Sequence, residues 1–510
     1  MSIVEYFSEH SGYRCGYCKS EDGSYSHGKR MWAHALTPMD YQDLIDRGWR
    51  RSGMYCYKPT MNIACCPQYT IRCEALNFRP SRSQKKVLKK MHKFLAYGRT
   101  KDDASNNESQ MKSFESDSHF EYPDVVRMKD IASKVEKDLK DKEFEDRPDL
   151  GSAKNTSQNE HNVLSEESKI VKNVTVKTSS KKEGDHTNSD RPLPKKAKLM
   201  RKERKIQKLL EKAKQEGTSE NVEQLLKKNQ TKQKNKVKTL NDFLNEPLPE
   251  NPAHRLQIRL VRSGLGNREF EKTFSVSHNI YEKYQMTIHG DPPDKCSEDQ
   301  YSWFLVKSPL KSLSQPEKRS EFFCGYGSFH QQYWLDDNLI AVGVVDVLPH
   351  CLSSVYLYYD PSYSFLSLGT YATLREIAFT QELNRIVPEL KYYYMGFYIH
   401  SCPKMRYKGN FEPSYLLCPE VYSWHPIEKC KPKLDISKYH RLNEDSNAED
   451  KDGIVDIGQV QILYQRQWIS YANYRKMRKG DCNEAEVAEY ARFVGRKCYS
   501  RMLLYRSSSK

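Results

Sequence analysis

The stretch NLIAVGVVDVL, residues 338–348, decides the fold class of this chain. It predicts a long apolar strand. A second strand is predicted over residues 354–359, and the Asp-Pro pair that follows ends it. Gly369 then opens a helix that we expect over residues 370–382, and an aromatic strand follows over residues 391–399.

Further elements extend this pattern in both directions. Residues 254–261 alternate between polar and apolar positions, as a half-buried strand does. Two helices are predicted near Val460–Met477 and Glu484–Tyr505, and the second has acidic residues at its start and basic residues at its end, which suits the helix dipole. The order strand, strand, helix, strand is the core order of the acetyltransferase (GNAT) fold, although many α/β domains share it.

The chain is expected to be an α+β protein in three parts. Residues 1–97, rich in Cys, Tyr, Gly and Trp, predict a small Cys-rich metal-binding domain that closes with a basic, solvent-facing helical stretch at residues 85–90. Residues 98–250 lack Trp and are rich in Ser, Asn, Glu and Lys, which is typical of a disordered linker. Residues 251–510 predict a GNAT-like α/β/α transferase domain with C-terminal helices.

Charge is unevenly distributed along the 510 residues. The formal net charge is +16, and residues 195–238 alone carry 16 Lys and Arg against five Glu, a net of +11. Such a block is either a solvated arm or a contact for a polyanion. Hydrophobic residues make up only 37% of the chain, so part of it is expected to be disordered.

Location is inferred from what the sequence lacks. No apolar run approaches the roughly 20 residues that a membrane helix needs, and the N-terminus MSIVEYFSEH has no secretory signal pattern. We therefore expect a monomer of the cytoplasm and nucleus with no membrane partner.

Cysteines cluster near the N-terminus. Six of the 14 lie between positions 15 and 73. Cys15 and Cys18 have the C-x-x-C spacing that lets two thiolates reach one metal, and Cys65 and Cys66 supply a second pair. Adjacent cysteines are unusual in a zinc finger, so Cys56 or Cys73 could replace one of them. Thiolates suit zinc and iron–sulfur clusters alike, so the metal stays open.

Three polar residues of the strand region are candidates for catalysis. His330 follows Gly327-Ser328-Phe329 and could be a base, a substrate ligand, or merely a hydrogen-bonded surface group in a loop. Asp346 interrupts an apolar strand, where a carboxylate needs a partner, so it either pairs with a core cation or faces a pocket. Asp360 ends a strand and could instead cap the turn before Pro361.

A distinctive block follows the aromatic strand. Residues 398–408 read YIHSCPKMRYK, with three alternating cations, Lys404, Arg406 and Lys408. These cations are either solvated or hold an anion.

These motifs together resemble the eukaryotic arginyl-tRNA–protein transferase family. The resemblance rests on the two cysteine pairs, on Gly327-Ser328-Phe329-His330, on residues 352–356 (LSSVY), on residues 398–408 and on residues 413–419 (PSYLLCP). It covers about residues 1–97 and 251–430, and the basic linker lies outside it.

The resemblance implies transfer of arginine from arginyl-tRNA to the α-amino group of proteins with acidic N-terminal residues, namely Asp, Glu and oxidised Cys. Such arginylation feeds the N-degron route of ubiquitin-dependent degradation. An aminoacyl ester is already activated, so neither CoA nor a nucleotide is needed. The candidate substrate-binding residues are Ser353, Ser354, Tyr356, Tyr398, Lys404, Arg406 and Lys408, and the candidate catalytic residues are Asp346, Asp360 and His330.

Two other functions compete with this interpretation. An acetyl-CoA-dependent N-acetyltransferase would need a Gly-rich pyrophosphate loop, whereas residues 364–370 (SFLSLGT) contain one glycine and no cation. A non-catalytic zinc-dependent RNA-binding protein would explain the cysteines and the charge, but it leaves the aromatic C-terminal region without a task.

Overall fold

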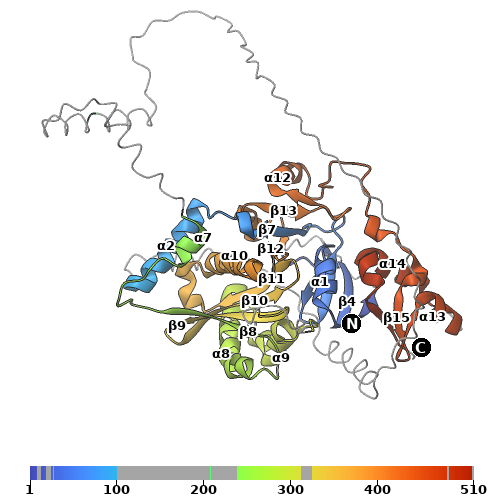
Figure 1. Ribbon diagram of the computed structural model, residues 1–510, viewed down its shortest axis with the longest axis horizontal. Helices are drawn as coiled ribbons and strands as arrows, with labels where there is room; N and C mark the ends of the chain where they lie inside the picture. Colours follow the sequence, from blue (N-terminus) through green and yellow to red (C-terminus); the bar gives the residue numbers. More distant parts are fainter. Residues whose placement is uncertain are drawn as a thin grey trace, which may run out of the picture. The chain divides into compact units, whose positions relative to one another are not determined.

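Two large β-sheets form the core, and each takes strands from both ends of the chain (Figure 1). The computed structural model describes residues 1–8, 13–18, 25–26, 28–99, 238–311, 324–478 and 482–507, together with position 207. Apart from position 207, all of these residues belong to one compact unit, formed by Met1–Phe144 and Lys238–Lys510. Most of the predicted linker, including nearly all of its basic block, lies outside the described residues.

The larger sheet has eight strands in the order β14-β13-β7-β12-β11-β10-β9-β8. Its neighbours are antiparallel except for β11 and β12, which run parallel. Its strands are β7 (Tyr69–Glu74), β8 (Leu256–Arg262), β9 (Gly327–Leu335), β10 (Asn338–Val347), β11 (Cys351–Tyr359), β12 (Tyr392–Tyr398), β13 (Ser414–Leu417) and β14 (Trp424–Pro426).

The smaller sheet has seven strands in the order β16-β15-β17-β1-β4-β6-β5. Strand β17, near the C-terminus, runs parallel to both β1 and β15. Its strands are β1 (Ile3–Phe7), β4 (Gly28–Ala35), β5 (Arg50–Ser52), β6 (Tyr55–Pro59), β15 (Gln461–Tyr464), β16 (Gln467–Ser470) and β17 (Leu503–Arg506). A short pair, β2 (Tyr13–Arg14) and β3 (Tyr25–Ser26), lies beside the first cysteines in the sequence.

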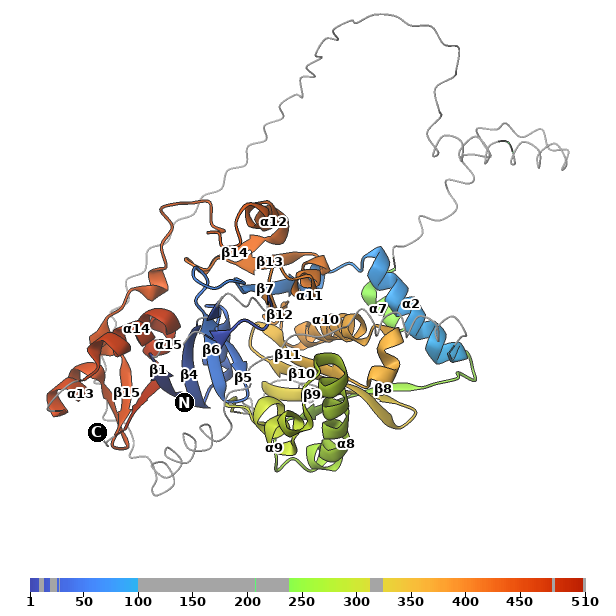
Figure 2. The ribbon, with the colours of Figure 1, turned by 180° about the vertical axis from the view of Figure 1, so that it is seen from behind.

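Helices cover both faces of the eight-stranded sheet (Figures 1 and 2). On one face, α10 (Leu368–Ile386) packs on β11 and β12, with α2 (Arg82–Tyr97) and α7 (Leu240–Leu244) beside it. On the other face, α8 (Arg268–Tyr284) packs on β10 and β11 and is followed by α9 (Glu298–Tyr301). Because both faces of β10 are covered, the apolar run from Leu339 to Val347 is buried throughout. No helix among the described residues is long and apolar enough to cross a membrane.

The predicted α+β class is confirmed, and so are the central elements. The runs predicted at 254–261, 338–348, 354–359 and 391–399 are strands β8, β10, β11 and β12, and the helix predicted at 370–382 is α10. The end of the predicted linker differs, because residues 238–250 include α7, whose Leu240 and Phe243 are buried. A Thr239–Asp242 capping box starts this helix.

The two predicted C-terminal helices need correction. The first region forms a hairpin, β15 and β16, before α13 (Tyr471–Met477), because β15 pairs with β17 and its turn residues adopt positive φ. The second helix, α14, spans only Glu484–Val494, since Gly495 with φ +84° ends it. After α15 (Arg496–Tyr499) the chain returns as β17.

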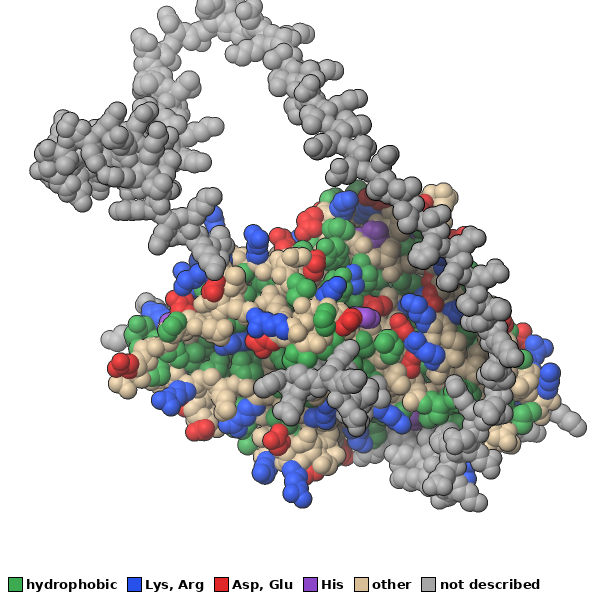
Figure 3. Space-filling view, in the orientation of Figure 1, with side chains coloured by type: hydrophobic (Ala, Val, Ile, Leu, Met, Phe, Trp, Pro, Cys, Tyr) green, Lys and Arg blue, Asp and Glu red, His purple; other side chains and the backbone are tan. Residues whose placement is uncertain are grey.

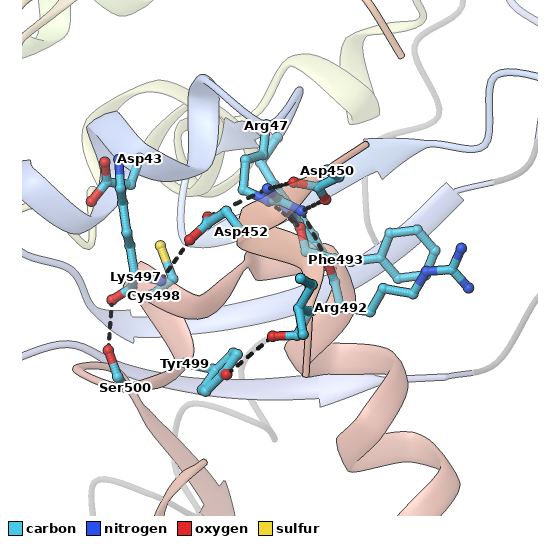
Figure 4. A network of polar contacts seen from close by, with 12 residues as sticks. Asp43, Arg47, Asp450, Asp452, Arg492, Phe493, Lys497, Cys498, Tyr499 and Ser500 are labelled. Carbon is cyan, nitrogen blue, oxygen red and sulfur yellow. Dashed lines mark hydrogen bonds and ion pairs between the residues drawn. The ribbon is translucent and has the colours of Figure 1, made fainter. Parts of the chain in front are cut away.

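A polar network joins the N-terminal and C-terminal segments (Figure 4). Arg47 follows α1 (Pro38–Ile45) and donates hydrogen bonds to both carboxylate oxygens of Asp450, at 2.9 and 2.5 Å. It also donates to Asp452 and to the backbone carbonyls of Arg492 and Phe493 at the end of α14. Every donor group of this guanidinium thus meets an acceptor from the last 61 residues of the chain.

Candidate functional site

Four cysteines converge as the two sequence pairs predict. The sulfur atoms of Cys15, Cys18, Cys65 and Cys66 all lie within 4.8 Å of one another, and those of Cys18 and Cys65 are 3.5 Å apart. Zn–S bonds of about 2.3 Å in a tetrahedron place sulfurs about 3.8 Å apart, so this arrangement fits a single ion. The hydrogen bond from Cys66 lowers the pKa of the Cys15 thiol, which favours a thiolate. Cys56 and Cys73, the alternative ligands, are buried elsewhere, on β6 and β7.

The cysteine cluster packs directly on the segment that follows β12. Ile399 is fully buried against Cys15 and Cys66, and Cys402 and Met405 pack on the same group. This segment continues as α11 (Pro403–Arg406) and η6 (Tyr407–Asn410), which carry the predicted cations. Whatever stabilises the cysteine cluster therefore also positions these cations.

The three cations occupy different environments. Lys404 and Arg406 are exposed. Lys408 is half-buried and donates a hydrogen bond of 3.1 Å to the Phe397 carbonyl. Burial and then the charge of Arg50 lower the pKa of Lys408 to about 8. Lys408 is thus the cation most closely tied to β12.

Arg50 is a second cation at β12 that sequence reasoning missed. It is 5% exposed and donates a hydrogen bond of 3.4 Å to the Gly396 carbonyl. Its Nε has no hydrogen-bond partner among the described residues. The sequence around Arg50 does not indicate that this residue lies close to β12. Its position depends on how the two sheets pack together.

Strands β11 and β12 separate along their length. Their ladder covers only three pairs, from Cys351↔Tyr392 to Ser353↔Tyr394. Val344 and Val345 of β10 pair with Tyr356 and Ser354, so the register shift leaves Val355 as an extra residue in β11, a β-bulge. Beyond this ladder, residues 354–359 of β11 and 395–398 of β12 are not paired with each other, and the region between these two parts is a wedge in the strand pairing. The term "wedge" is used for this region below.

Glu376 of α10 lies beneath the wedge, fully buried. Its Oε2 accepts a hydrogen bond of 2.5 Å from the Tyr393 hydroxyl, and the Ser354 hydroxyl also donates to it. Burial raises the pKa of Glu376 to about 7, and these two hydrogen bonds lower it in part. A Cβ at Gly343 would lie 2.7 Å from Glu376 Oε1, so a larger residue there would require this carboxyl group to shift.

Tyr407 connects the cationic segment with the wedge. Tyr407 is 42% exposed, but desolvation of its hydroxyl, followed by the neighbouring groups Glu376 and Tyr359, raises its pKa. Glu376, at the base of the wedge, is therefore an electrostatic neighbour of the segment that carries Arg406 and Lys408. A glutamate on the apolar face of a helix, with a lone glycine in a facing strand, is the signal that could have identified Glu376 in the sequence.

The other predicted substrate residues lie on β11 and β12. Ser353 is buried and Ser354 is half-buried. The Tyr356 hydroxyl donates a hydrogen bond of 2.8 Å to Gln285 and lies 3.3 Å from His289 Nε2. Tyr398 is buried, and its hydroxyl lies 2.7 Å from His400 Nδ1.

Asp346 has the partner that a buried carboxylate needs. Both of its oxygens accept from the guanidinium of Arg51, at 2.6 and 2.8 Å, and Ser328 donates at 2.7 Å. Asp346 and Arg51 are both almost completely buried. Asp346 therefore pairs with a cation in the core, which is one of the two alternatives that its sequence position allows.

Asp360 and His330 also have structural partners. Asp360 caps η5 (Pro361–Leu366) by accepting from the amide and hydroxyl of Ser362. The prediction that His330 lies in a loop is wrong, because it lies within β9 and is fully buried under α8. Its Nε2 lies 3.0 Å from the Leu305 carbonyl, and burial lowers the pKa of His330 to about 4, so the ring is neutral at pH 7.

Comparison with known proteins adds an independent finding. A family model described as "Arginine-tRNA-protein transferase, N terminus" matches residues 13–86, which include the cysteine cluster. A second model, described as "Arginine-tRNA-protein transferase, C terminus", matches residues 276–418, which include the wedge and the cationic segment.

Individual relatives agree with these models. Arginyl-tRNA–protein transferase 1 of Drosophila melanogaster is 42% identical, over 99% of both chains. Arginyl-tRNA–protein transferase 2 of Arabidopsis thaliana is 33% identical, over 93% of this chain and 82% of the plant protein. Aspartate/glutamate leucyltransferase of Pseudomonas fluorescens is 35% identical over 32% of this chain and 57% of the bacterial protein.

Proposed function

The chain belongs to the arginyl-tRNA–protein transferase family, and from that premise we propose that it transfers arginine from arginyl-tRNA to proteins. It is an aminoacyltransferase. The observation that carries this function is the similarity to the Drosophila melanogaster enzyme along nearly the whole of both chains. The local geometry supports a location for the reaction, the wedge between β11 and β12.

The proposed acceptors are proteins that begin with an acidic residue. A bacterial relative carries the name aspartate/glutamate leucyltransferase, and the two acidic residues in that name support this class. Arg50, Arg406 and Lys408 gather positive charge at the end of β12, and a carboxylate makes strong charge-assisted hydrogen bonds with such groups. Arginylated products of this kind would enter N-degron-dependent degradation, in the cytoplasm and nucleus.

A GNAT-like architecture for the transfer domain is supported by three features. The helix α10 connects the parallel strands β11 and β12, these strands diverge, and β11 carries a bulge next to the divergence. Where strands separate, backbone N–H groups lose their ladder partners and can donate elsewhere. We propose that these N–H groups donate hydrogen bonds to the carbonyl oxygen of the arginyl ester. This oxygen gains negative charge during attack.

The reaction itself is an aminolysis. The neutral α-amine of the acceptor attacks the ester carbon, a C–N bond forms, and the C–O bond to the terminal ribose breaks. The amine loses a proton and the ribose hydroxyl gains one. Since an α-amine has a pKa of about 7.7–8.0, only modest base assistance is required, and alignment of the two substrates supplies much of the rate.

Glu376 is the proposed proton acceptor for this step. Its pKa of about 7 lies close to that of the amine, so proton transfer between them is nearly balanced. The hydroxyls of Ser354 and Tyr393 donate to Glu376 and would relay the proton from the wedge. After transfer, the same route returns a proton to the departing ribose oxygen.

Cys15, Cys18, Cys65 and Cys66 are the residues that would hold a metal. The sulfur separations suit one tetrahedral ion, whereas a four-iron cluster, in which each thiolate binds a different iron, would need the sulfurs to move apart. A metal here would support the fold. The cysteines themselves hold Ile399, Cys402 and Met405 in place.

Labelled arginyl-tRNA and a set of peptides test the function. Label should pass to peptides that begin with Asp or Glu and not to matched peptides that begin with Ala or Lys, and acetyl-CoA should be inert. Acetyl transfer without arginine transfer would overturn the proposal in favour of an acetyltransferase.

A further inference from the structure

Helix α2 carries a row of exposed cations. Arg82, Lys86, Lys89 and Lys93 are all exposed and follow the spacing i, i+4, i+7, i+11, which places them on one side of the helix. This set is called the cationic row below. The opposite side, with Leu88, Met91 and Leu95, is buried against the core. The helix spans Arg82–Tyr97 and contains no Asp or Glu.

The cationic row is not neutralised by its surroundings. Among the residues that the structure describes, none forms an ion pair with any of its four members. Some cations elsewhere on the surface are paired, since Lys433 lies near Glu444 and Arg441 near Glu420. On the face drawn in Figure 3, blue and red side chains are interspersed. Like charges three or four residues apart repel each other on a helix, so a partner of opposite charge would stabilise this row.

The position of α2 connects the row with the wedge. Phe94 of α2 packs on Phe365 of η5 with ring centroids 5.6 Å apart, and the Lys90 ammonium lies 5.6 Å from the same ring. Segment η5 is the turn between β11 and α10, at the end of β11 where β11 and β12 have separated. Helix α2 therefore packs on the segment that directly follows the β11 side of the wedge.

We propose that the cationic row binds the sugar–phosphate backbone of the acceptor arm of the tRNA. This inference rests on the proposed function, because it requires the arginyl ester to lie in the wedge. The nucleotides that immediately precede the ester must then lie close to the wedge, and α2 packs on the segment that follows its β11 side. The row extends over roughly 16 Å, at 1.5 Å per residue, which is long enough to contact several successive phosphates. Lysine and arginine contacts of this kind supply affinity without reading sequence.

A triple variant, K86Q/K89Q/K93Q, tests the row. The matched control is K272Q/K295Q/K451Q, which removes three exposed lysines from other elements and changes the net charge equally. Binding of arginyl-tRNA is measured as a function of salt, together with KM and kcat for transfer to an Asp peptide. The row variant should raise KM for arginyl-tRNA at least tenfold and reduce the salt slope by about two, with kcat at saturating tRNA within twofold. The control should match the unmodified protein.

Two outcomes would overturn the proposal. If the row variant binds arginyl-tRNA with the same affinity and salt slope as the control, the row is either a solvated face or a site for an acidic protein. A loss of kcat with unchanged affinity would also contradict a binding role. K86R/K89R/K93R should restore binding, which separates charge from folding. If the unmodified protein bound tRNA through the row but transferred no arginine, the proposed function would fail while the surface assignment stood.

Discussion

Glu376 combines a buried carboxyl group with two hydroxyl partners beneath the wedge. Glu376→Gln keeps the shape and removes the base, so single-turnover transfer should fall about a hundredfold or more. In the unmodified protein the rate should rise with pH through about 7, as Glu376 loses its proton. The variant should lose this inflection and keep only that of the acceptor amine. An unchanged pH profile would remove Glu376 from the proton path.

The same residue makes stability depend on pH. Its pKa is about 7 in the folded protein and about 4.3 in an unfolded chain, so the folded state binds more protons between these values. Stability therefore falls as pH rises from about 4 to above 7, by roughly 4 kcal/mol if this group acts alone. Chemical denaturation at pH 5 and pH 8 should show a smaller decrease for Glu376→Gln. Equal decreases in both proteins would contradict the shifted pKa.

Arg406 is the exposed cation with which acceptor recognition can be tested. A charge-assisted hydrogen bond contributes roughly 1.5–3 kcal/mol, so its loss should lower transfer to Asp and Glu peptides about ten- to a hundredfold. Arg406→Glu should abolish that transfer and leave arginyl-tRNA affinity nearly intact. If Arg406 instead binds phosphate, tRNA affinity will fall for every acceptor alike. No change in either quantity would mean that this side chain is solvated.

The cysteine cluster and the segment after β12 pack together, because Ile399, Cys402 and Met405 contact the cysteines. We therefore expect a change in one to affect the order of the other. Cys65→Ser/Cys66→Ser should abolish metal binding, loosen residues 399–408 in hydrogen exchange and reduce transfer. Cys296→Ser should retain one metal per chain, since this cysteine is the last residue of η3 (Pro293–Cys296) and is not one of the four cluster residues. Metal analysis and absorbance of anaerobically purified protein distinguish zinc from iron–sulfur. A full metal complement in the double variant would exclude the pair as ligands.

Elements with a local signal could be predicted from the sequence, and those that depend on distant pairing could not. The apolar run of β10 and the C-x-x-C pair are readable within a few residues. Strand β15 was predicted as part of a helix, because its partner β17 lies some 40 residues further along the chain. Glu376 was missed because its hydrogen-bond partners, Ser354 and Tyr393, lie on two other elements. Asp346 was correctly identified as needing a partner, but the sequence could not show that Arg51, 295 residues away, supplies it.

The whole molecule is built so that its two ends depend on each other. Strand β7 lies between β12 and β13, and β17 lies between β1 and β15, so neither the N-terminal nor the C-terminal segment completes a sheet alone. The ion pairs of Arg51 with Asp346 and of Arg47 with Asp450 join the same two segments. The N-terminal and C-terminal segments are far apart in the sequence, but their strands are neighbours in both sheets.

Fragments of the chain should therefore be unable to fold separately. Residues 1–99 expressed alone would lack β17, one of the two partners of β1, and both partners of β7. Residues 238–510 would have a gap between β12 and β13, with unpaired backbone groups that cost free energy. Neither fragment should show a cooperative unfolding transition or transfer arginine. Coexpression of the two should restore both properties, because the sheets need the strands and not the covalent connection. A cooperative transition of residues 238–510 alone would instead mean that the C-terminal region is an autonomous domain on which the N-terminal strands merely dock.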